Sequence, residues 1–111
     1  MNLHLRVRTK KTDGSLRIAM GSGISDRLLP AIDYMVRGLQ LNKSDGQLLR
    51  FTRTSDGLTH LKVKKSAISV FIPVLLRAVK SEALSDLSQA QRQTIEAVFA
   101  WAKYENRTLF A

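Results

Sequence analysis

A chain of 111 residues that is 44% hydrophobic has the size and apolar content of one domain with a buried core. It contains no cysteine, which excludes disulfides and thiolate metal sites, and no apolar run approaches the ~18 residues of a membrane span or resembles a signal peptide. We therefore expect a single cytoplasmic domain over residues 1–111 that does not enter a membrane.

The chain contains an internal repeat, in which the features of residues 3–41 recur in the same order in residues 47–82. The offset between the two copies stays between 43 and 45 residues. The matched features are Leu5 and Leu49, Asp13-Gly14 and Asp56-Gly57, Leu16 and Leu61, Ile24 and Ile68, and Pro30 and Pro73. This order predicts a duplicated unit of strand, turn, strand and helix.

The strands of each unit alternate apolar with polar residues, which is typical of half-buried strands. In each copy an Asp-Gly pair separates two such segments, and glycine accepts the positive φ of a tight hairpin turn. We expect four strands with one apolar face and one basic face. The residues predicted to point outward are His4, Arg6, Arg8, Arg17, Arg50, Thr52, His60, Lys62 and Lys64.

Each hairpin leads into an amphipathic helix, which we expect to open at Pro30 in the first copy and at Pro73 in the second. The residues before the second proline, 68–72, are largely β-branched and apolar, which favours an extension of the sheet. A third helix over residues 88–105 is indicated by a capping box at Ser88 and Gln91. Its apolar stripe consists of Ile95, Val98, Phe99 and Ala102.

The predicted fold class is α+β, with the duplicated ββα unit forming a four-stranded, mainly antiparallel sheet. The helices cover one face, and the C-terminal helix joins them. Trp101, Tyr104 and Phe110 add apolar surface outside the stripe, so pairing of two copies through the helices is a further hypothesis.

The 18 Lys and Arg exceed the 9 Asp and Glu, a net charge of +9. Residues 1–65 hold 13 basic and 5 acidic residues, whereas residues 66–111 hold 5 and 4. Concentrated positive charge favours a polyanion partner, because each cation near a phosphate displaces a condensed counterion. The alternative is a solvated sheet face that only keeps the protein soluble. The predicted nucleic-acid-binding residues are His4, Arg6, Arg8, Lys10, Lys11, Arg17, Arg50, Arg53, His60, Lys62, Lys64 and Lys65.

Aromatic side chains are scarce in the predicted strands, which favours contact with the phosphate backbone over base stacking. Phe51 is the one Phe, Tyr or Trp there, and the alternation of its strand places it on the apolar, inward face. Stacking would require Tyr34, Phe71, Trp101 or Tyr104 to reach the basic face.

Two short segments resemble part of a known family. In each copy basic antiparallel strands are followed by a short segment and then by a proline that opens an amphipathic helix, at Gly23-Ile24-Ser25 to Pro30 and again at Ile68-Ser69 to Pro73. This order is similar to the end of the domain in the positive-cofactor-four and Whirly proteins, and the resemblance implies binding of single-stranded DNA on a curved sheet. That family has four strands before each helix, whereas two or three fit here.

We therefore expect a non-catalytic protein, cytoplasmic or nucleoid-associated. It should bind the phosphate backbone of single-stranded DNA or RNA. We expect no cofactor, no metal and no catalytic residue. One alternative is a protein-interaction module, an inhibitor or assembly factor, whose basic face docks an acidic partner. A lesser alternative is a metal-dependent nuclease that uses Asp13 and Asp56.

Overall fold

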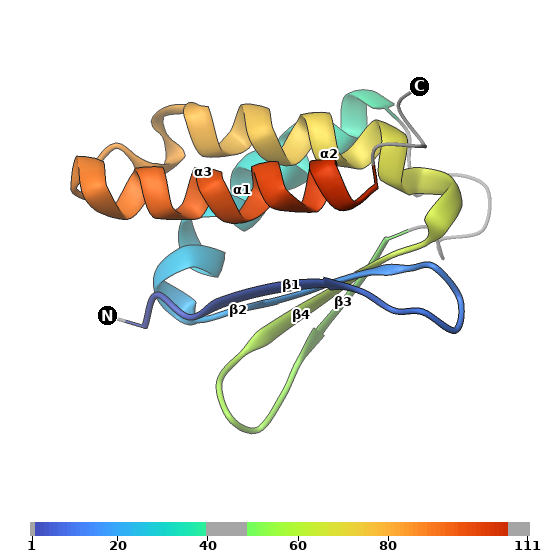
Figure 1. Ribbon diagram of the computed structural model, residues 1–111. Coiled ribbons are helices and arrows are strands. Elements are labelled where there is room, and N and C mark those ends of the chain that lie inside the picture. Colours follow the sequence, from blue (N-terminus) through green and yellow to red (C-terminus); the bar gives the residue numbers. More distant parts are fainter. Residues whose placement is uncertain (1, 40–48, 107–111) are drawn as a thin grey trace.

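The computed structural model describes residues 2–39 and 49–106 and has an α+β fold, in which helices cover one face of a four-stranded antiparallel sheet (Figure 1). In chain order the elements are β1 (Leu5–Thr9), β2 (Leu16–Met20), α1 (Ser22–Leu39), β3 (Leu49–Arg53), β4 (Thr59–Val63), α2 (Lys65–Lys80), the 3-10 helix η1 (Glu82–Leu84) and α3 (Gln89–Glu105). The predicted fold class is confirmed. The order of elements is the one that a duplicated ββα unit requires, and the duplication itself stays a prediction.

Both hairpins turn at the predicted Asp-Gly pairs. Gly14 has a φ of 69° and Gly57 a φ of 83°, a region that side chains with a Cβ rarely adopt. The two hairpins meet through their second strands, so the sheet order is β1-β2-β4-β3. Because β2 and β4 run antiparallel, the two turns lie at opposite ends of the sheet (Figure 1).

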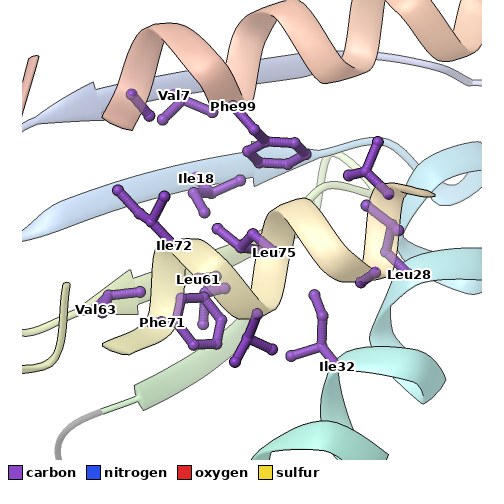
Figure 2. Packing of buried hydrophobic residues seen from close by; sticks show 14 of the residues in the cluster. Val7, Ile18, Leu28, Ile32, Leu61, Val63, Phe71, Ile72, Leu75 and Phe99 are labelled. Atoms are coloured by element: carbon purple, nitrogen blue, oxygen red, sulfur yellow. The ribbon is translucent and has the colours of Figure 1, made fainter. Parts of the chain in front are cut away.

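The predicted alternation of the strands matches their burial. Leu16, Ile18 and Met20 of β2 are fully buried under the helices, as are Leu61 and Val63 of β4. Figure 2 shows Phe71 of α2 and Phe99 of α3 directed into this cluster from the helix layer. Complete burial of each aromatic side chain contributes about 1.5–3 kcal/mol, so the sheet and the helices stabilise each other through this face.

The starts predicted for the first two helices are wrong. Pro30 lies inside α1, which begins at Ser22, and Pro73 lies inside α2, which begins at Lys65. Each proline removes one intrahelical hydrogen bond. The carbonyls that lose their partners belong to Asp26, which is exposed, and Ser69, which is half-buried, so neither residue lies in the core. Proline is therefore tolerated here beyond the first helical turn.

The predicted strand extension over residues 68–72 is also wrong, because these residues belong to α2. Ile68, Phe71, Ile72 and Leu75 are completely buried, and their spacing of three and four residues is helical. Burial of this stripe against the sheet outweighs the strand preference of the β-branched side chains.

Helix α3 begins as predicted. Ser88 Oγ accepts a hydrogen bond from the Gln91 amide at 3.1 Å, and Gln91 Oε1 accepts one from the Ser88 amide at 3.0 Å. At the other end, the buried Asn106 donates from Nδ2 to Thr9 Oγ1 at 3.3 Å, which joins the end of α3 to β1. The hydrophobic stripe of α3 and this contact hold the helix over the edge strand.

A side-chain ion pair joins α1 to the segment between η1 and α3. Arg27 donates from Nε and Nη2 to the Asp86 carboxylate at 2.6–3.0 Å, and from Nη1 to the Gly23 carbonyl at 2.7 Å. The hydrogen bonds between Arg27 and Asp86 lower the pKa of Asp86 and raise that of Arg27.

Within the described part of the chain, no helix has the length and apolar character needed to cross a membrane.

We expect Phe99→Ala to lower the free energy of unfolding by about 3–5 kcal/mol, because it leaves a cavity between α3 and the sheet. The matched control is Phe51→Ala on β3, where the phenyl ring is 44% exposed and the loss should be much smaller. Urea denaturation followed by circular dichroism measures both. Equal losses would show that α3 does not contribute to the core.

Candidate nucleic-acid interface

Four basic residues lie opposite one another across the sheet, on the face away from the helices. The strand register pairs Arg8 with Arg17, Arg17 with Lys62, and Lys62 with Arg50. Directly opposed residues on neighbouring strands lie about 4.5–5.5 Å apart at Cβ. We call these four residues the cation row.

A second row runs parallel to the first on the same face. The register places Arg6, Ala19, His60 and Thr52 next to one another on β1, β2, β4 and β3. Residues of both rows line a groove of about 600 Å³ on this face. Its lining residues are His4, Arg6, Arg8, Arg17, Ile18, Ala19, Thr52, Leu58, His60, Leu61 and Lys62.

Further lysines lie at the end of the sheet that carries the cation row. Lys10 and Lys11 follow β1 in its hairpin turn, while Lys64 and Lys65 follow β4 at the start of α2. The Lys65 side chain lies against the β1–β2 turn, where a Cβ added to Gly14 would meet its Cδ at 2.8 Å. The predicted lysines and the cation row therefore lie at the same end of the sheet.

Arg53 and Arg50 differ from the other predicted residues. Arg53 pairs with Thr59, so its register places it on the same face as Phe51 and Leu61 and not on the basic face. Arg53 is nevertheless exposed, since the turn end of the β3–β4 hairpin diverges from the helix layer (Figure 1). Arg50 belongs to the cation row by its backbone position, and its side chain lies outside the described residues.

Among the described residues, one carboxylate lies beside the cation row, that of Asp13, which the sequence places in a turn and in the nuclease alternative. Asp13 Oδ2 is 3.5 Å from Arg17 Nη2 and 3.8 Å from Lys62 Nζ. Ser15 Oγ accepts from Arg17 Nε at 2.8 Å, so the turn also holds the guanidinium in place. Within residues 2–39 and 49–106, no ion pair joins Arg6 or Arg8 to a carboxylate. Asp13 thus reduces the charge at the centre of the row and leaves that of β1 uncompensated.

The pKa of Asp13 is lowered to about 2 from the usual 3.8. Hydrogen bonds from the Ser15 hydroxyl and amide, at 2.6 and 2.9 Å, are the main cause, and the charges of Lys62 and Arg17 add to it. Asp13 is therefore ionised throughout the neutral range and acts as a fixed partner of the row.

The second turn aspartate, Asp56, lies at the other end of the sheet. Its Oδ1 accepts hydrogen bonds from the Thr54 hydroxyl and from the Leu58 amide, which lower its pKa, and the charge of His60 contributes. Asp13 and Asp56 are therefore not brought together, which removes the arrangement on which the nuclease alternative depends. No group of three or more metal-ligating His, Cys, Asp or Glu side chains occurs in the described residues.

None of the described Phe, Tyr and Trp side chains lines the groove. Phe71 is completely buried, and Phe51 is half-exposed on the face toward the helices. Tyr34 lies on α1, and Trp101 and Tyr104 lie on α3, all on the helix side of the sheet (Figure 1). The planar groups that the groove contains belong to arginine and histidine.

We expect Asp13→Asn to destabilise the protein in a pH-dependent way. Because the folded-state pKa is below the usual value, the ionised carboxylate stabilises the fold fully above about pH 4, and this contribution is lost as the pH falls toward 2. Urea denaturation at pH 7, 4 and 2 should show a difference from the parent that shrinks across this range. Ser15→Ala, which removes the hydroxyl donor, should give a smaller loss with the same pH dependence. A difference independent of pH would contradict this role of the carboxylate.

Comparisons with protein-family models, with curated proteins and with solved structures found no match to this chain.

Proposed function

We propose that this protein binds nucleic acid, single-stranded DNA or RNA, through the phosphate backbone and without catalysing a reaction. The observation that carries the proposal is the cation row, in which Arg8, Arg17, Lys62 and Arg50 lie opposite one another on the exposed face of the sheet. A polyanion is the ligand that such a row suits, since each phosphate contact releases a counterion.

The energetic cost of the row supports a functional interpretation over a solvated surface. Like charges directly opposite one another destabilise a sheet. A surface needed only for solubility would intersperse charges of both signs. Among the described residues one carboxylate contacts the middle of the row, and four lysines lie at the same end of the sheet. A ligand that carries regularly spaced negative charges relieves this repulsion.

The dimensions of the face favour a single strand. The four strands span ~14 Å from first to last. The major groove of B-form DNA alone is ~12 Å wide, so the face can cover little more than one groove of a duplex. A flexible strand can bend into the groove above Ala19 and keep its phosphates against the cation row, whereas a stiff duplex contacts the rim. The resemblance noted for Gly23-Ile24-Ser25 and Ile68-Ser69 points to the same class of ligand. A protein with this function belongs in the cytoplasm or on the nucleoid.

Charge reversal on the sheet tests the proposal. We expect Arg8→Glu/Lys62→Glu to weaken binding of a labelled 20-nucleotide single strand by at least tenfold at moderate salt. The dependence of log K on log salt should become shallower by about 0.7 for each phosphate that the variant no longer neutralises. Fluorescence anisotropy at several salt concentrations measures both quantities.

The matched control is Arg77→Glu/Lys80→Glu, which has the same net charge but changes two exposed residues of α2. It should bind nearly as tightly as the parent. Equal losses in the two variants would show that binding depends on net charge and not on the sheet. A parent that binds no oligonucleotide at moderate salt would instead favour the acidic protein partner.

The proposal includes pairing of two copies through α3. Trp101 is 49% exposed and Tyr104 is 61% exposed, and they lie one helical turn apart off the buried stripe. The charged residues of α3 also balance, which allows two strongly basic chains to approach here. These residues are Arg92, Glu96, Lys103 and Glu105. Phe110, which the same hypothesis included, lies outside the described residues.

We expect sedimentation equilibrium at tens of micromolar to show a dimer that Trp101→Gln/Tyr104→Gln converts to a monomer, because the exposed aromatic rings supply most of the apolar contact. The control is Tyr34→Gln, which removes an exposed aromatic ring from α1 and should leave the association unchanged. A monomeric parent at this concentration would remove pairing from the proposal without affecting the basic face.

A further inference from the structure

Ala19 interrupts the polar pattern of the basic face at its centre. The two residues beside it across the sheet, Arg6 on β1 and His60 on β4, carry long or planar polar side chains. Ala19 contributes only a methyl group and forms part of the groove floor. The short side chain leaves an open space between its two neighbours.

The width of this space follows from the strand spacing. Arg6 and His60 are separated by two strand intervals of ~4.8 Å, or about 10 Å between their backbones. Stacked bases lie ~3.4 Å apart, so a base held between two planar groups needs about 7 Å. The groove of about 600 Å³ that contains these residues also lies within the range of small-ligand sites. One nucleobase fits between the two side chains, with room for them to adjust.

The chemistry of the two walls suits an unpaired base. A guanidinium plane and an imidazole ring both stack on bases, and recognition of single strands uses both. Arg6 is exposed, and within the described ranges it makes no ion pair. Thr52, next to His60 in the same row, offers a hydroxyl that can bond to a base edge.

The space also lies at the right distance from the phosphate contacts. Arg8 follows Arg6 by two residues on β1, and Lys62 follows His60 by two residues on β4, so the cation row runs beside the space about 7 Å away along the strands. A nucleotide whose phosphate contacts the cation row can therefore place its base above Ala19. Base pairing and stacking in a duplex would prevent this.

We propose that Arg6, Ala19 and His60 form a slot that takes one unpaired nucleobase, stacked between the guanidinium and the imidazole over the alanine methyl. This inference rests on the proposed function and adds to it a contact that a bare polyphosphate chain cannot make. The slot then adds to the preference for single strands that the dimensions of the face favour, and the cation row supplies the phosphate contacts.

An abasic strand separates the two contributions. The probes are a labelled 20-nucleotide mixed-sequence DNA and a labelled 20-mer of the same length that has the sugar-phosphate backbone without bases. Stacking of one base changes affinity by about tenfold, so the parent should bind the normal strand about tenfold more tightly than the abasic strand. Fluorescence anisotropy at one salt concentration gives both dissociation constants.

Two variants test the slot itself. Ala19→Leu fills the space without a change in charge and should bind both probes with the affinity that the parent has for the abasic strand. Arg6→Lys keeps the charge but removes the planar group, and should reduce the preference for bases while the salt dependence stays that of the parent. The control for an added leucine is Ala90→Leu at an exposed position of α3, which should keep the full preference.

The outcomes distinguish the slot from the proposed function. If the parent binds both probes equally and with strong salt dependence, backbone binding stands and the slot is wrong. The slot is also wrong if Ala19→Leu keeps the preference for bases, or, should that variant fail to fold by circular dichroism, if Arg6→Lys keeps it. If the parent binds neither probe, the proposed function fails and the slot fails with it.

Discussion

The antiparallel pairing of β2 with β4 is the constraint on which the basic face depends. It brings the second strands of the two hairpins to the centre of the sheet in a register that places Arg17 opposite Lys62 and Ile18 opposite Leu61. A shift of one residue would turn the side chains of a strand to the other face. The buried pair therefore selects the register, and the same register aligns the cations. Hydrophobic burial on one side of the sheet creates the charge array on the other.

Much of this arrangement could be predicted from local patterns. The alternation around Leu16 and Leu61, the glycines at positive φ and the capping box at Ser88 each depend on neighbouring residues, and the structure agrees with them. The predicted helix starts are wrong because they assume that Pro30 and Pro73 lie in first turns, whereas both lie inside helices. For the second helix, the β-branched composition of residues 68–72 also favoured a strand. In both cases a buried helical stripe determines the outcome, and its burial depends on contacts with distant strands.

The parts of the candidate site that local patterns could not reveal are those that need two hairpins at once. Asp13 lies near Arg17 in the chain, but its approach to Lys62 requires the central strand pairing. Ala19 looks like an ordinary small strand residue until the register sets it between Arg6 and His60. Arg53 is different, because counting by twos from Phe51 already places it on the other face. The alternation along each strand decides which residues lie on the basic face. The pairing of the strands decides which of those residues become neighbours.

The cation row and the core have opposite effects on stability, and under the proposed function this balance links folding to ligand binding. Repulsion among opposed cations weakens the sheet, while the helices that pack through Phe71 and Phe99 hold the strands together from the other side. Asp13 offsets part of the repulsion without removing it, because one carboxylate contacts two cations at 3.5 and 3.8 Å. A bound polyanion would offset the rest only when the strands are paired, since an unfolded chain does not present the row. Any ligand that recognises this array therefore stabilises the folded state by mass action, and the same repulsion that costs stability in the free protein favours binding.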